Sequence, residues 1–215
     1  RFGRDGGIIP NGVVVTERVQ ENGVLKHFEL DQGKYFLAVG RFVPEKGFTE
    51  LLESFQHLSS MGYSRWNRWK LVFVGDSDHE DKFSRDFKRK SQTVPDVVLT
   101  GFQSGKTLQE LYSHAGHFIL PSYHEGLPIV LLEALSYGSS CLVSDIPANR
   151  EIDLEEERYF KPGNVVQMAR KLKRFIDRPV TEEERMKRIQ TITDRYNWTE
   201  ISQKTLDVYN GLFTF

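Results

Sequence analysis

The stretch of sequence that decides the fold is 35–58, which reads YFLAVGRFVPEKGFTELLESFQHL. It begins with five apolar residues, Tyr35–Val39, continues through the polar loop Gly40–Gly47, and ends with apolar residues at helical spacing. A run that is apolar throughout, rather than at alternate positions, is typical of a strand covered on both faces, as in a parallel sheet. The stretch therefore predicts a strand, a loop and a helix, in the order that parallel α/β domains repeat.

The same alternation continues along the chain. Short apolar runs predict further strands at Lys70–Val74, Val97–Thr100, His117–Leu120 and Ser140–Ser144, with weaker candidates at Gly7–Ile9 and Arg158–Phe160. Helical spacing predicts helices over 108–115, 127–137 and 165–176, a helix through Ile192 opened by the capping box Thr181–Glu184, and a last helix over 198–212. We predict one Rossmann-like, doubly wound parallel α/β domain with helices at its C-terminal end.

Length and charge exclude several classes of protein. The chain has 215 residues, 29 Lys and Arg against 30 Asp and Glu, and one cysteine, Cys141. A formal charge of −1 gives no general attraction to nucleic acid, and no run approaches the roughly 20 apolar residues of a membrane-spanning helix. A single cysteine, expected in the core, fits a reducing compartment, so we expect a cytoplasmic protein, with peripheral membrane association left open. The first residue is Arg1 rather than Met, which indicates a piece of a longer protein.

Two motifs invite other interpretations, and a third is absent. Gly101–Thr107 resembles a phosphate-binding loop, but it has three residues between its glycines where that motif has four, so we expect a turn with Thr107 as helix N-cap. Asp76-Ser77-Asp78 could bind a metal ion, but two carboxylates also suit the start of a helix, and we predict no metal site. No GxGxxG follows a strand, which disfavours an NAD-dependent oxidoreductase.

In doubly wound sheets the ligand lies beyond the carboxyl ends of the strands, so the candidate loops are Gly40–Gly47, Gly75–Asp81, Gly101–Thr107, Pro121–Pro128 and Asp145–Arg150. Two of them carry side chains that suit a phosphorylated ligand. In the first, Gly40–Gly47, Gly40 allows close backbone approach to a ligand, and Arg41 and Lys46 supply two cations that suit phosphate oxygens. An ordinary polar loop is the alternative.

The second loop opens a helix and reads PSYHEGLPIVLLE over 121–133. Pro128 suits the first position of a helix, which would leave the amides of Gly126, Leu127 and Ile129 facing outward as an anion site.

Two carboxylates accompany this helix. Glu125 lies just before it, and Glu133 falls in its second turn among apolar residues, where a carboxylate needs hydrogen-bond donors. The two hydroxyls of a ribose would supply them; a neighbouring arginine or backbone amide is the alternative. Together the two loops point to a nucleotide diphosphate that carries a polyol.

Four segments resemble the group 1 glycosyltransferases, the retaining family 4 of the GT-B architecture: Ile9–Val13, Gly40–Gly47, Pro121–Glu133 and Ser144–Ile152. Glu125 and Glu133, with seven residues between them, match the E-x7-E motif of that family. The resemblance implies that 1–215 is one half of a GT-B fold, the C-terminal nucleotide-sugar-binding domain. It also implies that 1–34 is a start and linker region and that the helix in 196–215 packs on a missing N-terminal domain.

The resemblance implies a role for each matching residue. Arg41 and Lys46 would hold the donor pyrophosphate, Glu133 the ribose, Glu125 the transferred sugar, and Gly101 and Phe102 would lie near the base. The implied catalytic residues are Glu125, Arg41 and Lys46, and the implied donor-binding residues are Gly40, Arg41, Lys46, Gly101, Phe102, Ser122, Glu125, Gly126, Leu127, Pro128, Ile129 and Glu133. The donor would be a UDP-, GDP- or ADP-sugar, with no cofactor and no metal required.

The implied activity is retaining hexosyl transfer in carbohydrate or polysaccharide biosynthesis. The acceptor, a glycan, a lipid or a small molecule, would be held by the missing N-terminal domain, so we expect this chain alone to be inactive. Without that domain, Trp198, Tyr209, Phe213 and Phe215 are expected to form an exposed apolar surface that allows self-association. The alternative is a nucleotide-sugar-binding module without catalysis.

Overall fold

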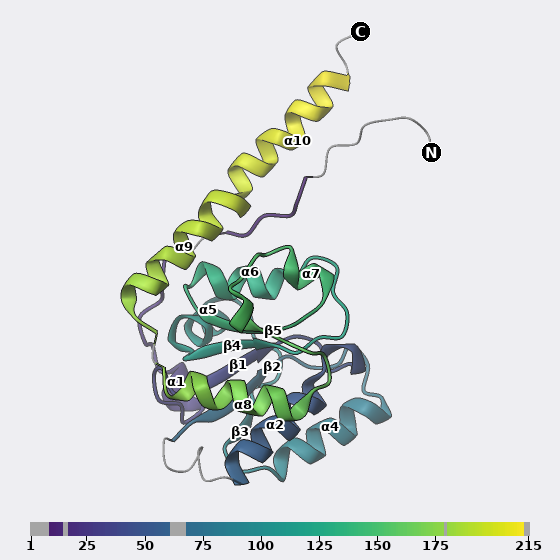
Figure 1. The fold of residues 1–215 in the computed structure, drawn as a ribbon, viewed down its shortest axis with the longest axis vertical. Helices are drawn as coiled ribbons and strands as arrows, with labels where there is room; N and C mark the ends of the chain where they lie inside the picture. Colours follow the sequence, from purple (N-terminus) through teal and green to yellow (C-terminus); the bar gives the residue numbers. More distant parts are fainter. Residues whose placement is uncertain (1–8, 15–16, 61–67, 179, 213–215) are drawn as a thin grey trace.

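The computed structural model describes residues 9–14, 17–60, 68–178 and 180–212. Its strands form one parallel sheet in the order β3-β2-β1-β4-β5-β6, which lies between two layers of helices (Figure 1). The strands are β1 (Tyr35–Val39), β2 (Lys70–Val74), β3 (Val97–Leu99), β4 (His117–Leu120), β5 (Ser140–Ser144) and β6 (Tyr159–Phe160). The predicted doubly wound parallel fold is confirmed. Of the weak candidate strand at residues 7–9, the first two residues lie outside the described ranges, and Ile9 is not in a strand.

The apolar strands are buried on both faces of the sheet. In β1, Tyr35, Leu37 and Val39 belong to the apolar cluster on one face, and Phe36 and Ala38 belong to the cluster on the other. Each large apolar side chain that is fully buried contributes about 1.5–3 kcal/mol relative to an exposed one. A strand of this kind needs apolar residues at every position, which is why the unbroken run predicted it correctly.

One layer of helices consists of α2 (Phe48–Ser60), α4 (Lys82–Gln92) and α8 (Val165–Ile176), and the other includes α1 (Val24–His27), α5 (Gly105–His114), α6 (Ile129–Ser136) and α9 (Glu182–Tyr196). Short helices follow β1 (η1, Pro44–Lys46), follow β5 (α7, Pro147–Arg150) and precede β6 (η2, Glu156–Arg158). The capping box before α9 is confirmed, since the hydroxyl of Thr181 accepts from the Glu184 amide while the Glu184 carboxylate accepts from the Thr181 amide.

Two predicted helix starts are wrong. The helix after β2 does not begin at Asp76–Asp78; it begins at Lys82, where Asp81 and Ser84 form a capping box. The helix after β3 begins at Gly105, with Ser104 at the N-cap position, so Thr107 lies inside its first turn. Asp76–Asp78 instead lie within the loop predicted over Gly75–Asp81, which matches the residues between β2 and α4, whereas the loop after β3 is shorter than the predicted Gly101–Thr107.

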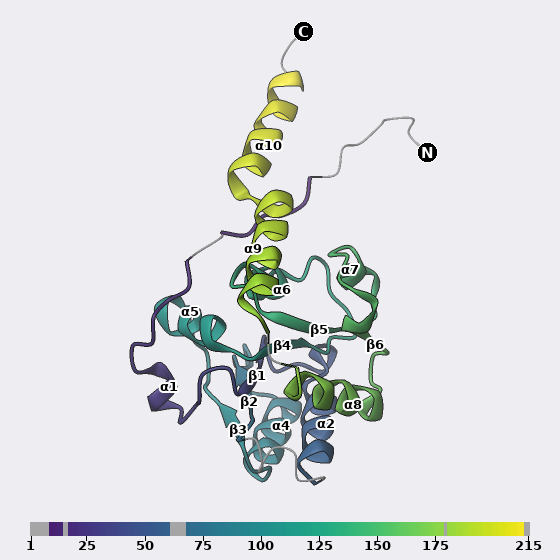
Figure 2. The same cartoon turned by 60° about the vertical axis from the view of Figure 1, so that its left-hand side comes forward.

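The last helix, α10 (Trp198–Leu212), extends away from the sheet in both views (Figures 1 and 2). The amino-terminal segment crosses near its start, where the Val13 amide donates to the Tyr196 carbonyl at 2.8 Å. Trp198 and Tyr209 are 44% and 57% exposed, and Leu206 and Val208 are exposed to a similar extent. The predicted exposed apolar surface is therefore present on this helix, whereas Phe213 and Phe215 lie outside the described residues.

His117 is a polar side chain inside the core. It stacks between the rings of Trp69 and Phe175, at centroid distances of 5.5 and 4.7 Å, and its Nε2 lies 2.9 Å from the Phe175 carbonyl oxygen. Burial disfavours the charged ring and lowers the pKa of His117 to about 3 from an ordinary value of 6.5. The folded protein therefore keeps this ring neutral at pH values where an unfolded chain would protonate it.

Lowering the pH from 7 to 5 is expected to remove about 2 kcal/mol from the free energy of unfolding through His117 alone. The stabilising effect is complete above pH 6.5 and is lost as the pH falls toward 3, because only the unfolded chain takes up the proton in that range. Urea unfolding at both pH values, with wild type and His117→Gln, isolates this contribution because glutamine does not titrate. Equal losses in the two proteins would contradict the prediction.

Candidate functional site

A cavity of about 490 Å³ lies at the carboxyl ends of β1 and β2, beside the point where the strand order reverses between β1 and β4. Its walls come from the loops after β1, β2 and β3 and from α5 and α6, and the residues that line it are Val39, Gly40, Arg41, Val74, Gly75, Asp76, Ser77, Asp78, Phe102, Gln103, Leu108, Val130 and Glu133. The volume suits a small organic ligand, and this is where ligands bind in doubly wound folds. The structure thus brings together four of the predicted site residues, Gly40, Arg41, Phe102 and Glu133.

The backbone at the base of the cavity is closely packed. The Gly40 amide donates to the Val74 carbonyl at 3.0 Å, and the Gly75 amide donates to the Gly101 carbonyl at 2.9 Å. Gly101 therefore joins the loops at the edge of the cavity, next to Phe102. The Phe102 ring is 76% exposed, so a large apolar face is available to a flat ligand.

Arg41 lies at the mouth of the cavity and pairs with Asp78, with 2.8 Å between Nη1 and Oδ2. Both side chains are more than half exposed, and the hydrogen bond from Arg41 to Asp78 raises the pKa of the arginine. Sequence reasoning missed Asp78 as a site residue because it assigned 76–78 to the start of a helix. An anion that binds Arg41 must compete with this carboxylate.

Glu133 is partly buried and accepts a hydrogen bond from the Tyr112 hydroxyl at 3.0 Å. Burial raises its pKa, and the bond from Tyr112 opposes that shift. The partner is a phenol rather than the arginine or backbone amide considered above. The apolar spacing that predicted a helix over 108–115 includes Tyr112, but it did not predict a hydrogen bond from its hydroxyl. Within the described part of the chain, Oε1 of Glu133 accepts no hydrogen bond, so it remains available to a ligand.

Glu133 also lines a second, adjoining cavity of about 330 Å³. Val13, Trp198 and the half-exposed Ile129 contribute to its walls. The segment around Val13 thus comes next to the candidate site, although more than a hundred residues separate them in sequence.

Lys46, Ser122 and Glu125 form a hydrogen-bonded cluster between the two predicted loops. Lys46 Nζ and Ser122 Oγ lie 2.7 and 2.6 Å from the same oxygen, Oε1 of Glu125, and the lysine and glutamate side chains are 16% and 10% exposed. The amide of Tyr123 donates to the Glu45 carbonyl at 2.8 Å and so joins the loops. The cluster lies beside the described lining of the 490 Å³ cavity rather than in it. The stem of Lys46 is nevertheless close, since a Cβ atom built on Gly40 would lie 3.6 Å from Lys46 Cε.

The start of α6 differs from the prediction in two respects. Pro128 takes the N-cap position, and the Ile129 amide donates to the Leu127 carbonyl at 2.9 Å, so this amide is not available to an anion. Among the described residues, the amides of Gly126, Leu127 and Val130 have no protein acceptor. Three free amides therefore remain near the start of the helix, with Val130 in place of Ile129.

Two features are absent from the described residues. They contain no group of three or more His, Cys, Asp or Glu side chains placed to hold a metal ion. None of the helices within the described ranges is both long enough and apolar enough to cross a bilayer.

Comparison with known proteins gives a consistent result. The family model described as "Glycosyl transferases group 1" matches residues 21–194. An uncharacterized glycosyltransferase of Methanocaldococcus jannaschii, MJ1607, is 30% identical over 182 residues, which cover 83% of this chain and 45% of that protein.

Two solved structures share the fold at low sequence identity. A TarM mutant of S. aureus, in complex with fondaparinux, alpha-GlcNAc-glycerol and UDP, has a TM-score of 0.76 and 20% identity and covers 97% of this chain and 40% of its own. Anabaena Alr3699/HepE, in complex with UDP and glucose, has a TM-score of 0.70 and 15% identity and covers 82% of this chain and 48% of its own. The chain thus spans less than half the length of each of these three proteins.

Proposed function

This chain belongs to the group 1 glycosyl transferases, and on that premise we propose that its 490 Å³ cavity binds a nucleotide diphosphate sugar for retaining glycosyl transfer. The observation that carries the proposal is the content of this cavity. An exposed aromatic face, a carboxylate with an unused oxygen and a guanidinium line the same space. These groups match the base, the ribose and the phosphates of a nucleotide.

Each part of the donor has a partner in this proposal. Phe102 stacks on the base, and Oε1 of Glu133 accepts hydrogen bonds from the ribose hydroxyls. Arg41 leaves Asp78 to bind the pyrophosphate, and the free amides at the start of α6 add further donors. Because UDP is named in the complexes of both structural neighbours, a UDP-sugar is the first donor to test.

The Lys46–Ser122–Glu125 cluster supplies the remaining groups. Lys46 exchanges Glu125 for a phosphate oxygen, and Glu125 then accepts hydrogen bonds from hydroxyls of the transferred sugar. As the bond between the anomeric carbon and the phosphate oxygen breaks, Arg41 and Lys46 stabilise the charge on the departing diphosphate. The acceptor hydroxyl attacks from the face that the leaving group vacates, and a departing phosphate oxygen takes its proton.

We further propose that the acceptor site belongs to an N-terminal half that this chain lacks. The chain spans 45% of the archaeal relative. The helix α10 extends away from the sheet (Figure 1), and its exposed apolar side chains suit a surface for such a half. The chain alone then binds donor but transfers nothing, and the exposed face of α10 allows self-association, which light scattering at increasing protein concentration detects. Joining the N-terminal half to this chain should restore glycosyl transfer. If the joined protein still transfers no sugar, the chain is a binding module.

Glu133→Ala is expected to weaken UDP binding by about 1–3 kcal/mol, which is the usual cost of losing hydrogen bonds to a charged group. Glu125→Ala is expected to weaken UDP-glucose but not UDP, because the sugar is the part of the donor that Glu125 contacts and its loss frees Lys46 for the phosphate. Glu183→Ala, an exposed carboxylate on α9, is the matched control and should change neither. Isothermal titration of the three variants with both ligands tests this, and equal losses in Glu125→Ala and Glu133→Ala would refute the division of roles.

A further inference from the structure

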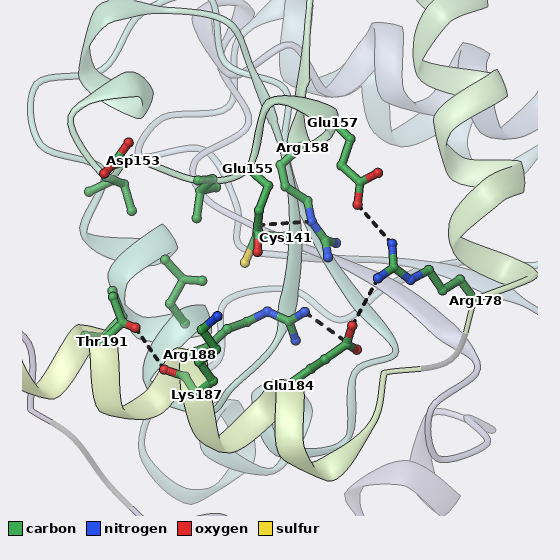
Figure 3. Close-up of a pocket in the computed structure, with 14 residues that line it drawn as sticks. Cys141, Asp153, Glu155, Glu157, Arg158, Arg178, Glu184, Lys187, Arg188 and Thr191 are labelled. Atoms are coloured by element: carbon green, nitrogen blue, oxygen red, sulfur yellow. Dashed lines mark hydrogen bonds and ion pairs between the residues drawn. The ribbon is translucent and has the colours of Figure 1, made fainter.

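A separate cavity of about 400 Å³ lies near the amino ends of β5 and β6, away from the carboxyl ends of β1 and β2. Figure 3 shows the side chains that line it. Its walls come from the end of α6, the start of β5, the segment 152–158 and α9. None of the residues that line it belongs to the proposed donor site. The donor site therefore does not account for the side chains that line this cavity.

Three arginines from different parts of the chain direct their guanidinium groups into this cavity. Arg158 comes from η2, Arg178 from the connection between α8 and α9, and Arg188 from α9 (Figure 3). Arg178 is well matched, because it lies 3.0 Å from Glu157 and 3.1 Å from Glu184. The other two arginines are not.

Arg158 and Arg188 are deeply placed and poorly paired. Their side chains are 6% and 14% exposed. Arg158 Nε is 3.5 Å from Glu155, and Nη1 donates to the Ser140 hydroxyl, which carries no charge. Among the described residues, the hydrogen-bond and ion-pair partners of Arg188 are the Gly138 carbonyl at 3.4 Å and Glu184 at 4.0 Å. Burial and the charge of Arg158 both lower the pKa of Arg188, so the two cations oppose each other.

An anion would relieve this arrangement. Buried charges without close partners are unfavourable, and two guanidinium groups offer several parallel N–H donors to a doubly charged oxyanion. The carboxylates of Asp153 and Glu155 lie at the rim, 86% and 68% exposed, where they can accept hydrogen bonds from hydroxyl groups. The cavity thus holds three arginines inside, with the Glu184 carboxylate between Arg178 and Arg188, and two further acceptors at its mouth.

We propose that this cavity binds a small phosphorylated polyol, with its phosphate between Arg158 and Arg188 and its hydroxyls toward Asp153 and Glu155. The proposal is independent of the donor site. The two sites share one element, α6, because Leu135 lines this cavity and Glu133 lines the other. A ligand here does not compete with UDP for space.

The test uses isotope-labelled chain saturated with UDP, titrated with glucose 6-phosphate, glucose or inorganic phosphate. We expect glucose 6-phosphate to shift the amide resonances of Ser140, Leu154 and Arg188. Glucose should bind too weakly to detect, and inorganic phosphate at least tenfold more weakly than the ester because it lacks hydroxyls. No binding of the ester, or shifts confined to Gly75 and Phe102, would overturn the proposal. Equal affinity for inorganic phosphate would overturn the polyol part of it.

Variants then connect the signal to the arginine pair. Arg188→Gln should weaken glucose 6-phosphate at least tenfold, whereas Arg89→Gln, an exposed arginine on α4, should change nothing. Arg188→Lys keeps the charge without the planar donor group, so it should weaken glucose 6-phosphate binding several-fold. It replaces Arg188→Gln in the test if the glutamine variant does not fold. Equal affinities in wild type, the Arg188 variants and the Arg89 control would refute the assignment.

Discussion

Gly75→Ala is expected to destabilise the protein by about 3 kcal/mol or more. A Cβ atom built on Gly75 would lie 2.0 Å from the carbonyl oxygen of Gly40, and Gly75 has a φ of +137°, which side-chain-bearing residues rarely adopt. Both obstacles involve backbone, so no side-chain rotation can relieve them. The loop after β1 would have to move, and this loop carries Arg41 and Lys46.

Urea unfolding and thermal melts measure this effect, and a loss of 3 kcal/mol corresponds to about 6–12 °C in Tm for a chain of this size. Gly23→Ala is the matched control, because Gly23 also has a positive φ, +93°, but a Cβ there meets no atom within 4 Å. Gly126→Ala, with open space and no positive φ, should be nearly neutral. If Gly75→Ala lowers the free energy of unfolding no more than Gly23→Ala does, the two loops do not approach each other as closely as described. The fraction of the Gly75→Ala variant that still folds should also bind UDP weakly, because the displaced loop carries Arg41 and Lys46.

The fold could be predicted largely because its strands are buried on both faces. In β1 all five residues are buried, so the sequence has no polar position that could hide the strand. The helix α4, whose start was predicted wrongly, is the opposite case. Its eleven residues, KFSRDFKRKSQ, include only two large apolar side chains, and its start depends on the Asp81–Ser84 capping box rather than on periodicity.

The candidate site was predictable as an edge of the sheet but not as a set of contacts. The position of Lys46 and Glu125 after two neighbouring strands indicated that they lie close together. Nothing local indicated that Lys46 and Ser122 both donate to the same carboxylate oxygen of Glu125. Asp78 was not predicted as a site residue because residues 76–78 suited the start of a helix, whereas α4 begins at Lys82. Arg158 and Arg188 are 30 residues apart on different elements and share no motif, so only the folded chain reveals them as a pair.

Lys46→Met is expected to cost about 3 kcal/mol of stability, because it leaves the carboxylate of Glu125 largely buried without its cation. Ser122 still donates to that carboxylate, but a neutral hydroxyl replaces little of the lost attraction. The double variant Lys46→Met, Glu125→Leu should recover most of the loss, since well-packed apolar residues substitute for buried ion pairs at little net cost. Urea unfolding of the two single variants and the double variant gives the coupling free energy directly.

The control is another lysine–glutamate pair, Lys90 with Glu53, which has 2.6 Å between its charged atoms but is 42% exposed on both sides. Lys90→Met should cost less than about 1 kcal/mol, because water screens this pair. The difference between the two lysines bears on function as well as on stability. If Lys46 exchanges Glu125 for a donor phosphate, part of the binding free energy is spent on opening a shielded pair, so the Glu125→Gln variant should hold UDP more tightly than wild type. If Lys46→Met lowers the free energy of unfolding no more than Lys90→Met does, burial does not strengthen the Lys46–Glu125 pair. If Glu125→Gln leaves the UDP affinity unchanged, the pair does not compete with the ligand.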